Sequence, residues 1–460
     1  MSEVNFLKKK GGVTFMSSSN NIPLTVDATQ AGLANTQVYM YVIGEVLTPS
    51  ATTFYRLDAS GMPHVMSLSD NTNAAETFPD SNLLSAEAVA AIAPNYPLQW
   101  ADYSIPVSLS ELTSINLADI NPTNCPGLGT GLAAFSGRVY ISIGVPRLPF
   151  TVVDGGYTGP VALAFPGMYT LFDWIEFSFD SEANFSGNTT QVNQFGLELM
   201  LDGNPGGTRQ GKLKTLRGAI LARFGENLPA PFGGGVLQVP VPTGAASAYP
   251  AGTDFLRVVS PLELTAPASY SGPLATYFDS VIAQAYTTWQ TTPIVTNDIA
   301  TGYYTGIVPT SGSSSGILTF YQGNYPTLAE LQAANPGVAF QLTGSDPATN
   351  VILTSDVWQC ANTLATGSPA QLNVEKMLAA AFNRGVIANL LDDATCQYDA
   401  PSFYPEGGTW NEWARFFHVV SVNGLAYGFP YDDLCNQAPY ITLSNTQAVR
   451  ITLGLFNYGP

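Results

Sequence analysis

Short runs rich in β-branched and aromatic residues dominate the first part of the chain. They occupy residues 38–43, 54–61, 137–144 and 172–180, and turns rich in Gly, Pro, Ser or Asn separate them. In several of these runs apolar and polar residues alternate, which is typical of strands that bury one face. Spaced strands with turns between them predict a β-sandwich or β-barrel for this part of the chain.

Three later segments have a helical pattern instead. Their apolar residues recur at spacings of three and four, over 213–224 with Thr208 as an N-cap, over 274–289 and over 373–391. This spacing predicts three helices. Strand patterns return at 415–422, 425–431 and 448–455. The dipeptide Asn423-Gly424 between the first two predicts a hairpin turn.

The order of these patterns predicts two lobes, as does a length of 460 residues, more than one core usually serves. The fold class we expect is mainly β, with a β lobe packed on a mixed α/β lobe. The predicted divisions are a disordered tail over 1–19, the first part of the β lobe over 20–205, the mixed lobe over 206–399 and a return to the β lobe over 400–460.

Charged residues make up only 11% of the chain, where about 25% is typical. Ser, Thr, Asn, Gln and Gly must therefore cover much of the surface, together with aromatic residues. Such a surface suits uncharged sugars, although a β-protein without sugar affinity fits the composition equally well. With 16 basic and 34 acidic residues the net charge is −18, which repels phosphate backbones and disfavours nucleic acid as a partner.

Metal, cofactor and membrane functions have little support. The four cysteines, Cys125, Cys360, Cys396 and Cys435, form no CxxC pair, and the only histidines are the distant His64 and His418. We expect neither a metal nor a cofactor. If the protein is exported, the cysteines can form one or two disulfides, and the sequence favours no particular pairing. No run reaches the 18 apolar residues of a membrane span, and no apolar stretch of signal-peptide length follows the first lysines.

Glu176 is the acidic residue with the most suggestive surroundings. It lies in the run Phe172-Asp173-Trp174-Ile175-Glu176-Phe177-Ser178, where aromatic neighbours would desolvate the carboxyl group and keep its acid form toward neutral pH. A general acid that cleaves glycosidic bonds needs this property. On a strand, Trp174 and Ser178 share the face of Glu176, while Asp173 lies on the other. The alternative is an edge-strand glutamate that faces water.

This run, together with residues 188–196, resembles the catalytic region of glycoside hydrolase family 64, the laminaripentaose-producing β-1,3-glucanases with a thaumatin-like domain. Further segments follow in the order of that family, at 22–26, 42–44, 257–261, 277–279, 356–360, 381–384 and 427–433. The resemblance implies a thaumatin-like barrel or sandwich packed on an α/β lobe, with a wide groove for β-1,3-glucan between them. It also implies an inverting mechanism, a monomer and an extracellular location.

The resemblance assigns Glu176 as the general acid and places the family's general base, an aspartate, at Asn193. An amide cannot take a proton from water near neutral pH. Three explanations stay open. The loop register differs by a residue or two, the protein binds glucan with little hydrolysis, or another carboxylate is the base, from the set Asp180, Glu182, Asp432 and Asp433.

Substrate contacts are expected at further polar and aromatic positions that match the family or flank Glu176. These are Trp174, Ser178, Asp180, Thr190, Gln191, Asn383, Arg384, Tyr431, Asp432 and Asp433. Structural roles compete with this assignment, because turn aspartates cap backbone amides and an arginine at a helix end is often structural. Trp410 and Trp413 fit sugar stacking and core packing equally, and His418 fits a structural position.

Overall fold

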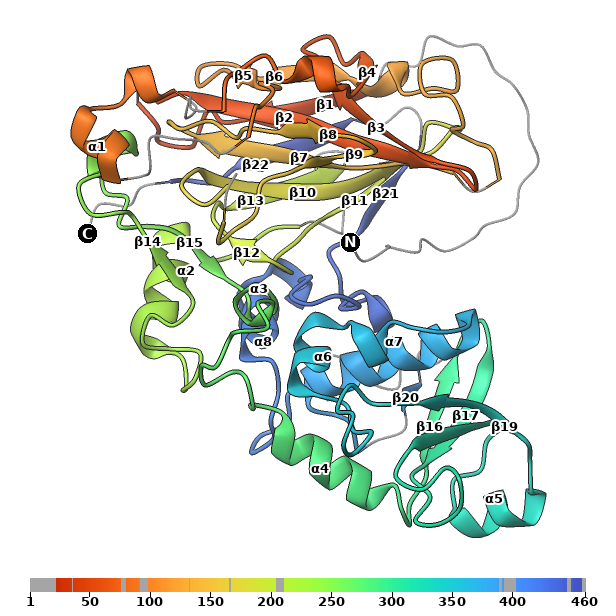
Figure 1. Ribbon diagram of the computed structural model, residues 1–460. Helices are drawn as coiled ribbons and strands as arrows, with labels where there is room; N and C mark the ends of the chain where they lie inside the picture. Colours follow the sequence, from red (N-terminus) through yellow and green to blue (C-terminus); the bar gives the residue numbers. More distant parts are fainter. Residues whose placement is uncertain are drawn as a thin grey trace.

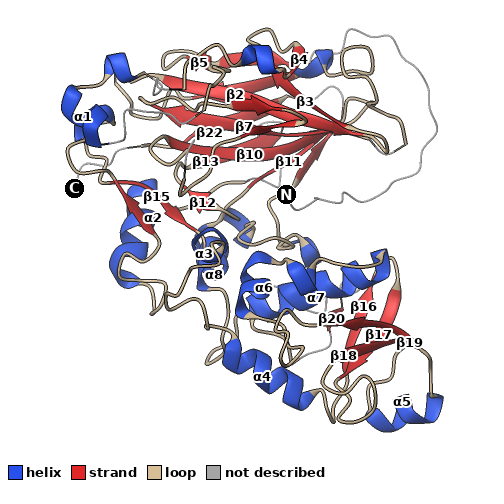
Figure 2. Cartoon of the chain, viewed as in Figure 1, coloured by secondary structure: helices blue, strands red, loops and turns tan. Residues whose placement is uncertain are grey.

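The protein is described here from a computed structural model that defines residues 22–34, 36–75, 80–91, 98–131, 133–164, 167–203, 211–388, 391–392, 403–444 and 448–456. A β lobe contains the first half of the chain, and a second lobe of helices and small sheets lies beneath it in Figure 1. Figure 2 shows that strands dominate the first lobe and that most of the helices belong to the second. The predicted tail over residues 1–19 lies outside the described residues.

The β lobe is built from two facing sheets. The larger has the order β21-β11-β10-β7-β2-β3-β4, with β5 paired to β2, and the smaller has the order β13-β22-β1-β6. The larger sheet comprises Ile441–Leu443 (β21), Phe185–Thr189 (β11), Leu171–Phe179 (β10), Phe135–Ile143 (β7), Val38–Leu47 (β2), Thr52–Leu57 (β3), Pro63–Val65 (β4) and Ile105–Val107 (β5). The smaller comprises Leu199–Gly203 (β13), Val449–Leu453 (β22), Pro23–Asp27 (β1) and Thr113–Asn116 (β6). In the described residues these sheets form an open sandwich.

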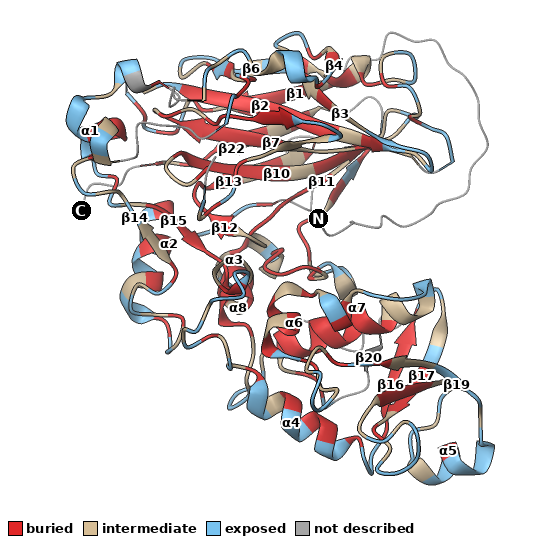
Figure 3. Cartoon of the chain, in the orientation of Figure 1, coloured by how far each residue is buried: buried red, intermediate tan, exposed pale blue. Residues whose placement is uncertain are grey.

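The alternation predicted from the sequence decides which face of the larger sheet enters the core. Val139, Ile175 and Phe177 point inward and pack with residues of the smaller sheet, such as Ile451. The opposite face of the same strands carries a separate aromatic cluster that includes Trp174. Figure 3 shows the buried strands at the centre of this lobe. Small additions border it, namely helix α1 (Ala86–Ala91) and the hairpin of β8 (Thr151–Val153) and β9 (Gly156–Thr158).

The second lobe has a core of its own, to which Phe224, Trp358 and Phe382 belong. Its five-stranded sheet has the order β19-β18-β17-β16-β20, from Val338–Leu342, Leu318–Gln322, Gly302–Ile307, Ile294–Asp298 and Leu391–Asp392. A three-stranded sheet, β12-β15-β14, consists of Gln194–Phe195, Phe255–Val259 and Gln238–Pro240. The helices are α2 (Arg217–Ala222), α3 (Pro261–Thr265), α4 (Asp279–Thr288), α5 (Leu328–Ala334), α6 (Thr354–Gln359), α7 (Pro369–Arg384) and α8 (Glu412–Val420).

The three expected helices correspond to α2, α4 and α7, and Thr208 lies outside the described residues. The strand expected at 415–422 is wrong, because this segment forms most of helix α8. Its aromatic residues recur at helical spacing, so that Trp413, Phe416 and Phe417 reach the core of the second lobe. Asn411 caps the helix by accepting a hydrogen bond from the amide of Ala414 at 3.2 Å.

The strand expected at 425–431 is also absent from the described fold, since this segment is a loop. The chain re-enters the sandwich at β21, which pairs with β11, and at β22, which runs parallel to β1. Residues 400–460 therefore divide between the two lobes, because α8 and the following loop pack into the second lobe first.

Cys125 and Cys360 are buried free thiols, and Cys396 lies outside the described residues. No helix within the described ranges is long and apolar enough to cross a membrane. The same residues contain no group of three or more His, Cys, Asp or Glu side chains arranged to hold a metal ion.

Candidate active site

Glu176 lies in the middle of β10, on the face that points away from the sandwich core. It pairs with Arg138 of β7 on one side and with Asn188 of β11 on the other. Trp174 and Ser178 share its face, as the strand period requires, while Ile175 packs into the core. Glu176 is therefore on an inner strand, with two strands beyond it on the β21 side, and the edge-strand alternative does not apply.

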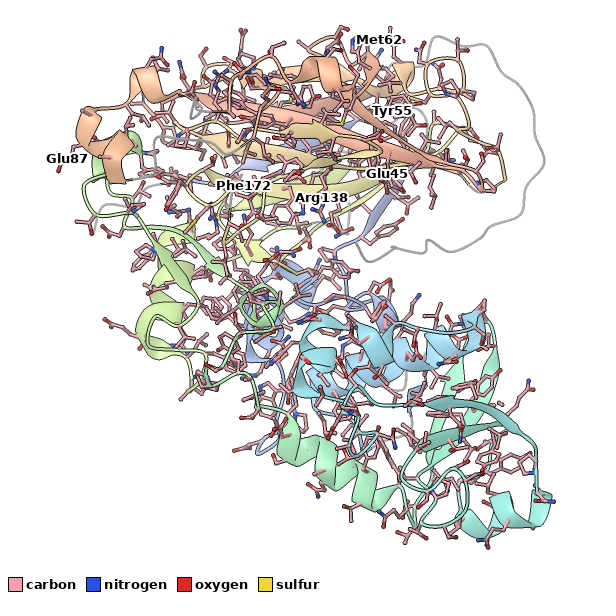
Figure 4. All side chains as sticks on the ribbon, in the orientation of Figure 1. Glu45, Tyr55, Met62, Glu87, Arg138 and Phe172 are labelled. Atoms are coloured by element: carbon pink, nitrogen blue, oxygen red, sulfur yellow. The ribbon has the colours of Figure 1, made fainter. Side chains whose placement is uncertain are left out.

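Arg138 is the principal neighbour of Glu176. One guanidinium nitrogen lies 3.1 Å from Glu176 Oε1, and the two side chains are 40% and 21% exposed. The guanidinium also lies over the Trp174 ring, 5.0 Å from its centre. Figure 4 labels Arg138 among the inner strands of the larger sheet, where β7 lies between β10 and β2. The sequence predicted aromatic and apolar neighbours for Glu176; the structure adds a cation and partial exposure of the side chain.

Asn193 follows β11 in the chain and is hydrogen-bonded to a second carboxyl group. Its side-chain Nδ2 donates to Glu263 Oε1 at 2.6 Å. Its backbone oxygen accepts a hydrogen bond of 2.8 Å from the amide of Ser260, the residue that caps α3. The position expected to hold a general base thus holds an amide that is joined to Glu263.

The segment after Asn193 is fixed directly against β10. Asp173 accepts hydrogen bonds from the amides of Gly196 and Leu197 at 2.7 and 3.1 Å, and Gln194 Nε2 donates to the carbonyl of Phe172 at 2.8 Å. A side chain at position 196 would not fit, because a Cβ would lie 2.4 Å from the Phe172 oxygen. Burial raises the pKa of Asp173 to about 7, against the opposing effect of its backbone hydrogen bonds. Asp173 therefore has a structural position beneath the site.

Glu263 completes the group. Burial raises the pKa of its carboxyl, while the hydrogen bond from Asn193 and the charge of Arg138 act in the opposite direction. The guanidinium that contacts Glu176 thus also acts on Glu263. A short sequence signal precedes this residue, since Ser260-Pro261 followed by Glu263 is typical of a helix start. Nothing in the sequence indicated its partner, because the contact depends on the pairing of β12 with β15.

The remaining candidates near β10 have internal contacts. Asp180 accepts hydrogen bonds from the amides of Glu182 and Asn184, both at 2.9 Å, and so holds the turn between β10 and β11. Thr190 and Gln191 are buried, and the backbone oxygen of Gln191 accepts a hydrogen bond from the Trp413 indole at 2.8 Å. This bond joins the two lobes just before Asn193.

Arg384 and Asp432 are brought together, but away from solvent. The Arg384 guanidinium lies 3.0 Å from Asp432 Oδ1, and the two side chains are 3% and 0% exposed. The other oxygen of Asp432 lies 3.0 Å from His418 Nε2 and accepts a hydrogen bond from the amide of Gly428 at 2.9 Å. Asp432 is thus held in a buried network, which makes it unsuited to contact a polymer directly.

Asn383, Tyr431 and Asp433 surround this network in different ways. Asn383 is buried and donates to the carbonyl of Val357 at 3.0 Å, which fixes α7 against α6. Tyr431 is half-buried, with the Lys376 ammonium 5.4 Å from its ring centre. Asp433 is exposed, yet enough protein surrounds it for desolvation to raise the pKa of its carboxyl. Of the predicted contacts in the second lobe, Asp433 and Tyr431 are the accessible ones.

The arrangement has the features of a glycoside hydrolase. The Arg138 guanidinium lies over the Trp174 ring, contacts Glu176 and also influences Glu263, on a protein whose chain has few charged residues. Glycosidases commonly use such a pair of Asp or Glu side chains on either side of the scissile bond.

Comparisons with known proteins identify the particular family. Residues 20–453 match the β-1,3-glucanases of glycoside hydrolase family 64, and the chain belongs to this family. A β-1,3-glucanase domain from Clostridium beijerinckii has a similar structure, with a TM-score of 0.67, 22% identity and coverage of 96% of this chain and 100% of that one. A laminaripentaose-producing β-1,3-glucanase in complex with laminaritetraose has a TM-score of 0.66 and 21% identity, with coverage of 96% of this chain and 100% of that one.

A third structure, the laminaripentaose-producing enzyme from Paenibacillus barengoltzii complexed with laminarihexaose, has a TM-score of 0.55 and 20% identity over 95% of this chain and 76% of its own. No curated protein matches the sequence significantly. The resemblance stated from the motifs is therefore confirmed, and the protein is a glycosidase of the β-1,3-glucanase family.

Proposed function

We propose that the protein hydrolyses β-1,3-glucan, with Glu176 as the acid that protonates the departing glycosidic oxygen. The observation that carries this proposal is the position of Glu176, on an inner strand, partly open to solvent and beside a tryptophan and an arginine. The laminarioligosaccharides bound in the solved relatives support the same substrate class. The accessible Tyr431 and Asp433 are the residues we propose to assist in binding the polymer, whereas Trp174 and Ser178 are buried beside Glu176.

Two measurements test the substrate. Incubation with laminarin or curdlan should release reducing ends, whereas carboxymethyl-cellulose and chitin should not. Affinity electrophoresis should show retardation in laminarin and normal mobility in carboxymethyl-cellulose. Equal mobility in both gels, together with no release of reducing ends, would contradict the proposal.

A second candidate function rests on Asn193. Because an amide stands where the family's base is expected, a glucan-binding protein with little hydrolysis would have this sequence too. Retardation in laminarin without any reducing ends would favour it.

We further propose that the protein acts as a monomer outside the cell. The resemblance to the family carries the first point, and the second follows because a polymeric glucan cannot enter a cell intact. Size-exclusion chromatography and fractionation of the producing cells test these two points.

A further inference from the structure

We propose that Glu263 is the second catalytic carboxylate of this chain and that Asn193 holds it in position. In this assignment, which rests on the proposed function, Glu263 takes the proton from the water that attacks the sugar. It explains why an amide occupies position 193 in a chain that otherwise has the features of a hydrolase.

The contact between Asn193 and Glu263 makes an aspartate at position 193 unfavourable. The two side-chain atoms are 2.6 Å apart, so a carboxylate there would face another carboxylate at hydrogen-bond distance. Such a pair cannot ionise fully at neutral pH, because like charges this close repel. An amide donates a hydrogen bond instead, which orients Glu263 and favours its charged form. The carboxylate of Glu263 therefore lies one hydrogen bond away from Asn193, the position where the family's base was expected.

The Glu263 side chain does not form the capping hydrogen bond that is usual at its position in α3. A glutamate three residues after a serine N-cap normally accepts a hydrogen bond from the backbone amide of that serine. Here the amide of Ser260 donates to the carbonyl oxygen of Asn193 at 2.8 Å. The Glu263 side chain turns to the Asn193 amide instead, while its own backbone amide still donates to Ser260 Oγ at 3.3 Å. Two hydrogen bonds thus fix Asn193 and α3 to each other.

The positive charge of Arg138 acts on both carboxyl groups. Its guanidinium forms the ion pair with Glu176 at 3.1 Å and also acts on the charge of Glu263. Behind Glu263, the buried Arg257 of β15 donates to the carbonyl oxygens of Ala162 and Met168 at 2.7 and 3.0 Å, which fixes the strand that leads into α3. Among the described residues, Asn193 is the hydrogen-bond donor to the Glu263 carboxylate, and it uses Oε1. A carboxylate has acceptor capacity for several further hydrogen bonds, one of which suits a water molecule.

The other carboxylates considered from the sequence are less suitable. Asp180 uses both oxygens to hold a turn, and Asp432 uses both in a buried network. Glu182 is exposed at the turn between β10 and β11. Asp433 lies beside Asp432 in the second lobe, and the side chain of Asn193 is hydrogen-bonded to Glu263.

The reaction balances with these two groups. Glu176 in its acid form gives its proton to the glycosidic oxygen as the bond from that oxygen to the anomeric carbon breaks. Water forms the new bond to the anomeric carbon from the opposite side, and Glu263 accepts the proton that this water loses. The products are a shortened glucan with a new reducing end and a released sugar chain, and the two carboxyl groups then exchange a proton with solvent.

The test begins with Glu263→Gln, which keeps an acceptor for Asn193. On laminarin, kcat should fall by about 10²–10⁴-fold, the usual contribution of a general base, while retardation in laminarin gels is kept. Sodium azide should restore turnover by taking the place of the activated water, and it should leave a glycosyl azide of inverted configuration. A structural role for Glu263 would not produce this azide product.

The control is Glu375→Gln, which also replaces a helical glutamate that accepts a hydrogen bond from an amide, here Gln371 Nε2 at 2.8 Å. Glu375 is fully buried, whereas Glu263 is half-buried. The control variant should keep activity within about threefold, a barrier change below about 0.7 kcal/mol. The exchange variant Asn193→Asp/Glu263→Gln moves the carboxylate across the hydrogen bond. It should be at least tenfold faster than Glu263→Gln.

The outcomes separate two levels of failure. An active parent with an active Glu263→Gln, or a slow Glu263→Gln that neither azide nor the exchange variant restores, overturns the assignment of Glu263 alone. If Glu263→Gln does not fold, the exchange variant is measured by itself. Activity within about tenfold of the parent then supports the assignment, and lower activity overturns it. A parent inert on laminarin overturns the proposed function and the role of Glu263 with it.

Discussion

Replacing Glu176 by glutamine should remove most of the activity and almost none of the stability. The amide cannot release a proton to the glycosidic oxygen, so kcat should fall by about 10²–10⁴-fold, which is about 3–5 kcal/mol of barrier. The stability change follows from the ion pair with Arg138, whose side chains are 40% and 21% exposed. A pair this open to solvent contributes at most about 1 kcal/mol. The glutamine oxygen can still accept the hydrogen bond from Arg138.

The leaving group distinguishes lost proton donation from lost position. An aryl laminarioligosaccharide with an acidic phenol leaves without help from an acid. Glu176→Gln should therefore recover most of the parent's rate on this substrate, while it stays slow on laminarin. Thermal unfolding and laminarin gels should show the parent's behaviour. Glu182→Gln is the control, because Glu182 is an exposed glutamate in the turn that follows β10.

Two results would refute this reasoning. If Glu176→Gln keeps laminarin hydrolysis within about threefold of the parent, the acid is another residue. If it slows both substrates equally, Glu176 acts on binding or geometry, and proton donation is not its role.

Two further predictions concern stability. Asp432→Asn should destabilise the protein by about 3–5 kcal/mol, because it leaves the buried Arg384 cation without its counter-ion; a loss below about 1 kcal/mol by urea denaturation would contradict this. Burial raises the pKa of the Glu375 carboxyl to about 7, while the hydrogen bond from the amide of Thr366 acts in the opposite direction. The stability that Glu375 contributes is therefore complete below the unfolded pKa near 4.5 and is lost as pH rises through about 7. Urea titrations from pH 5 to 8 should therefore show a smaller loss for Glu375→Gln than for the parent, and parallel losses would contradict this.

Residue patterns predicted the face of β10 well. The period of two along this strand was enough to put Trp174 and Glu176 together and Asp173 on the other side. The order of the family motifs then indicated the family and the substrate class, which residue periodicity cannot indicate. Helix α7 was also predicted, although every residue from Met377 to Arg384 is buried, so that the second half of this helix is enclosed on all sides.

The failures lie where tertiary contacts decide. The segment 415–422 is rich in β-branched and aromatic residues, and only burial against the second lobe makes it a helix. Arg138 lies 38 residues from Glu176 in the chain and Glu263 lies 70 residues from Asn193. Strand pairing and the short sheet of β12 and β15 create these neighbours, so local sequence could not indicate them.

Position 193 shows why a missing motif residue does not by itself indicate a missing function. A general base is defined by where its oxygen lies relative to the attacking water, and the element that supplies the oxygen is secondary. Asn193 and Glu263 approach to 2.6 Å, so either side chain can bring a carboxylate to nearly the same place. What must be kept is one carboxylate and one neutral donor across that contact, because two carboxylates would share a proton and two amides would accept none. The chain satisfies this condition with the roles exchanged between the loop and α3.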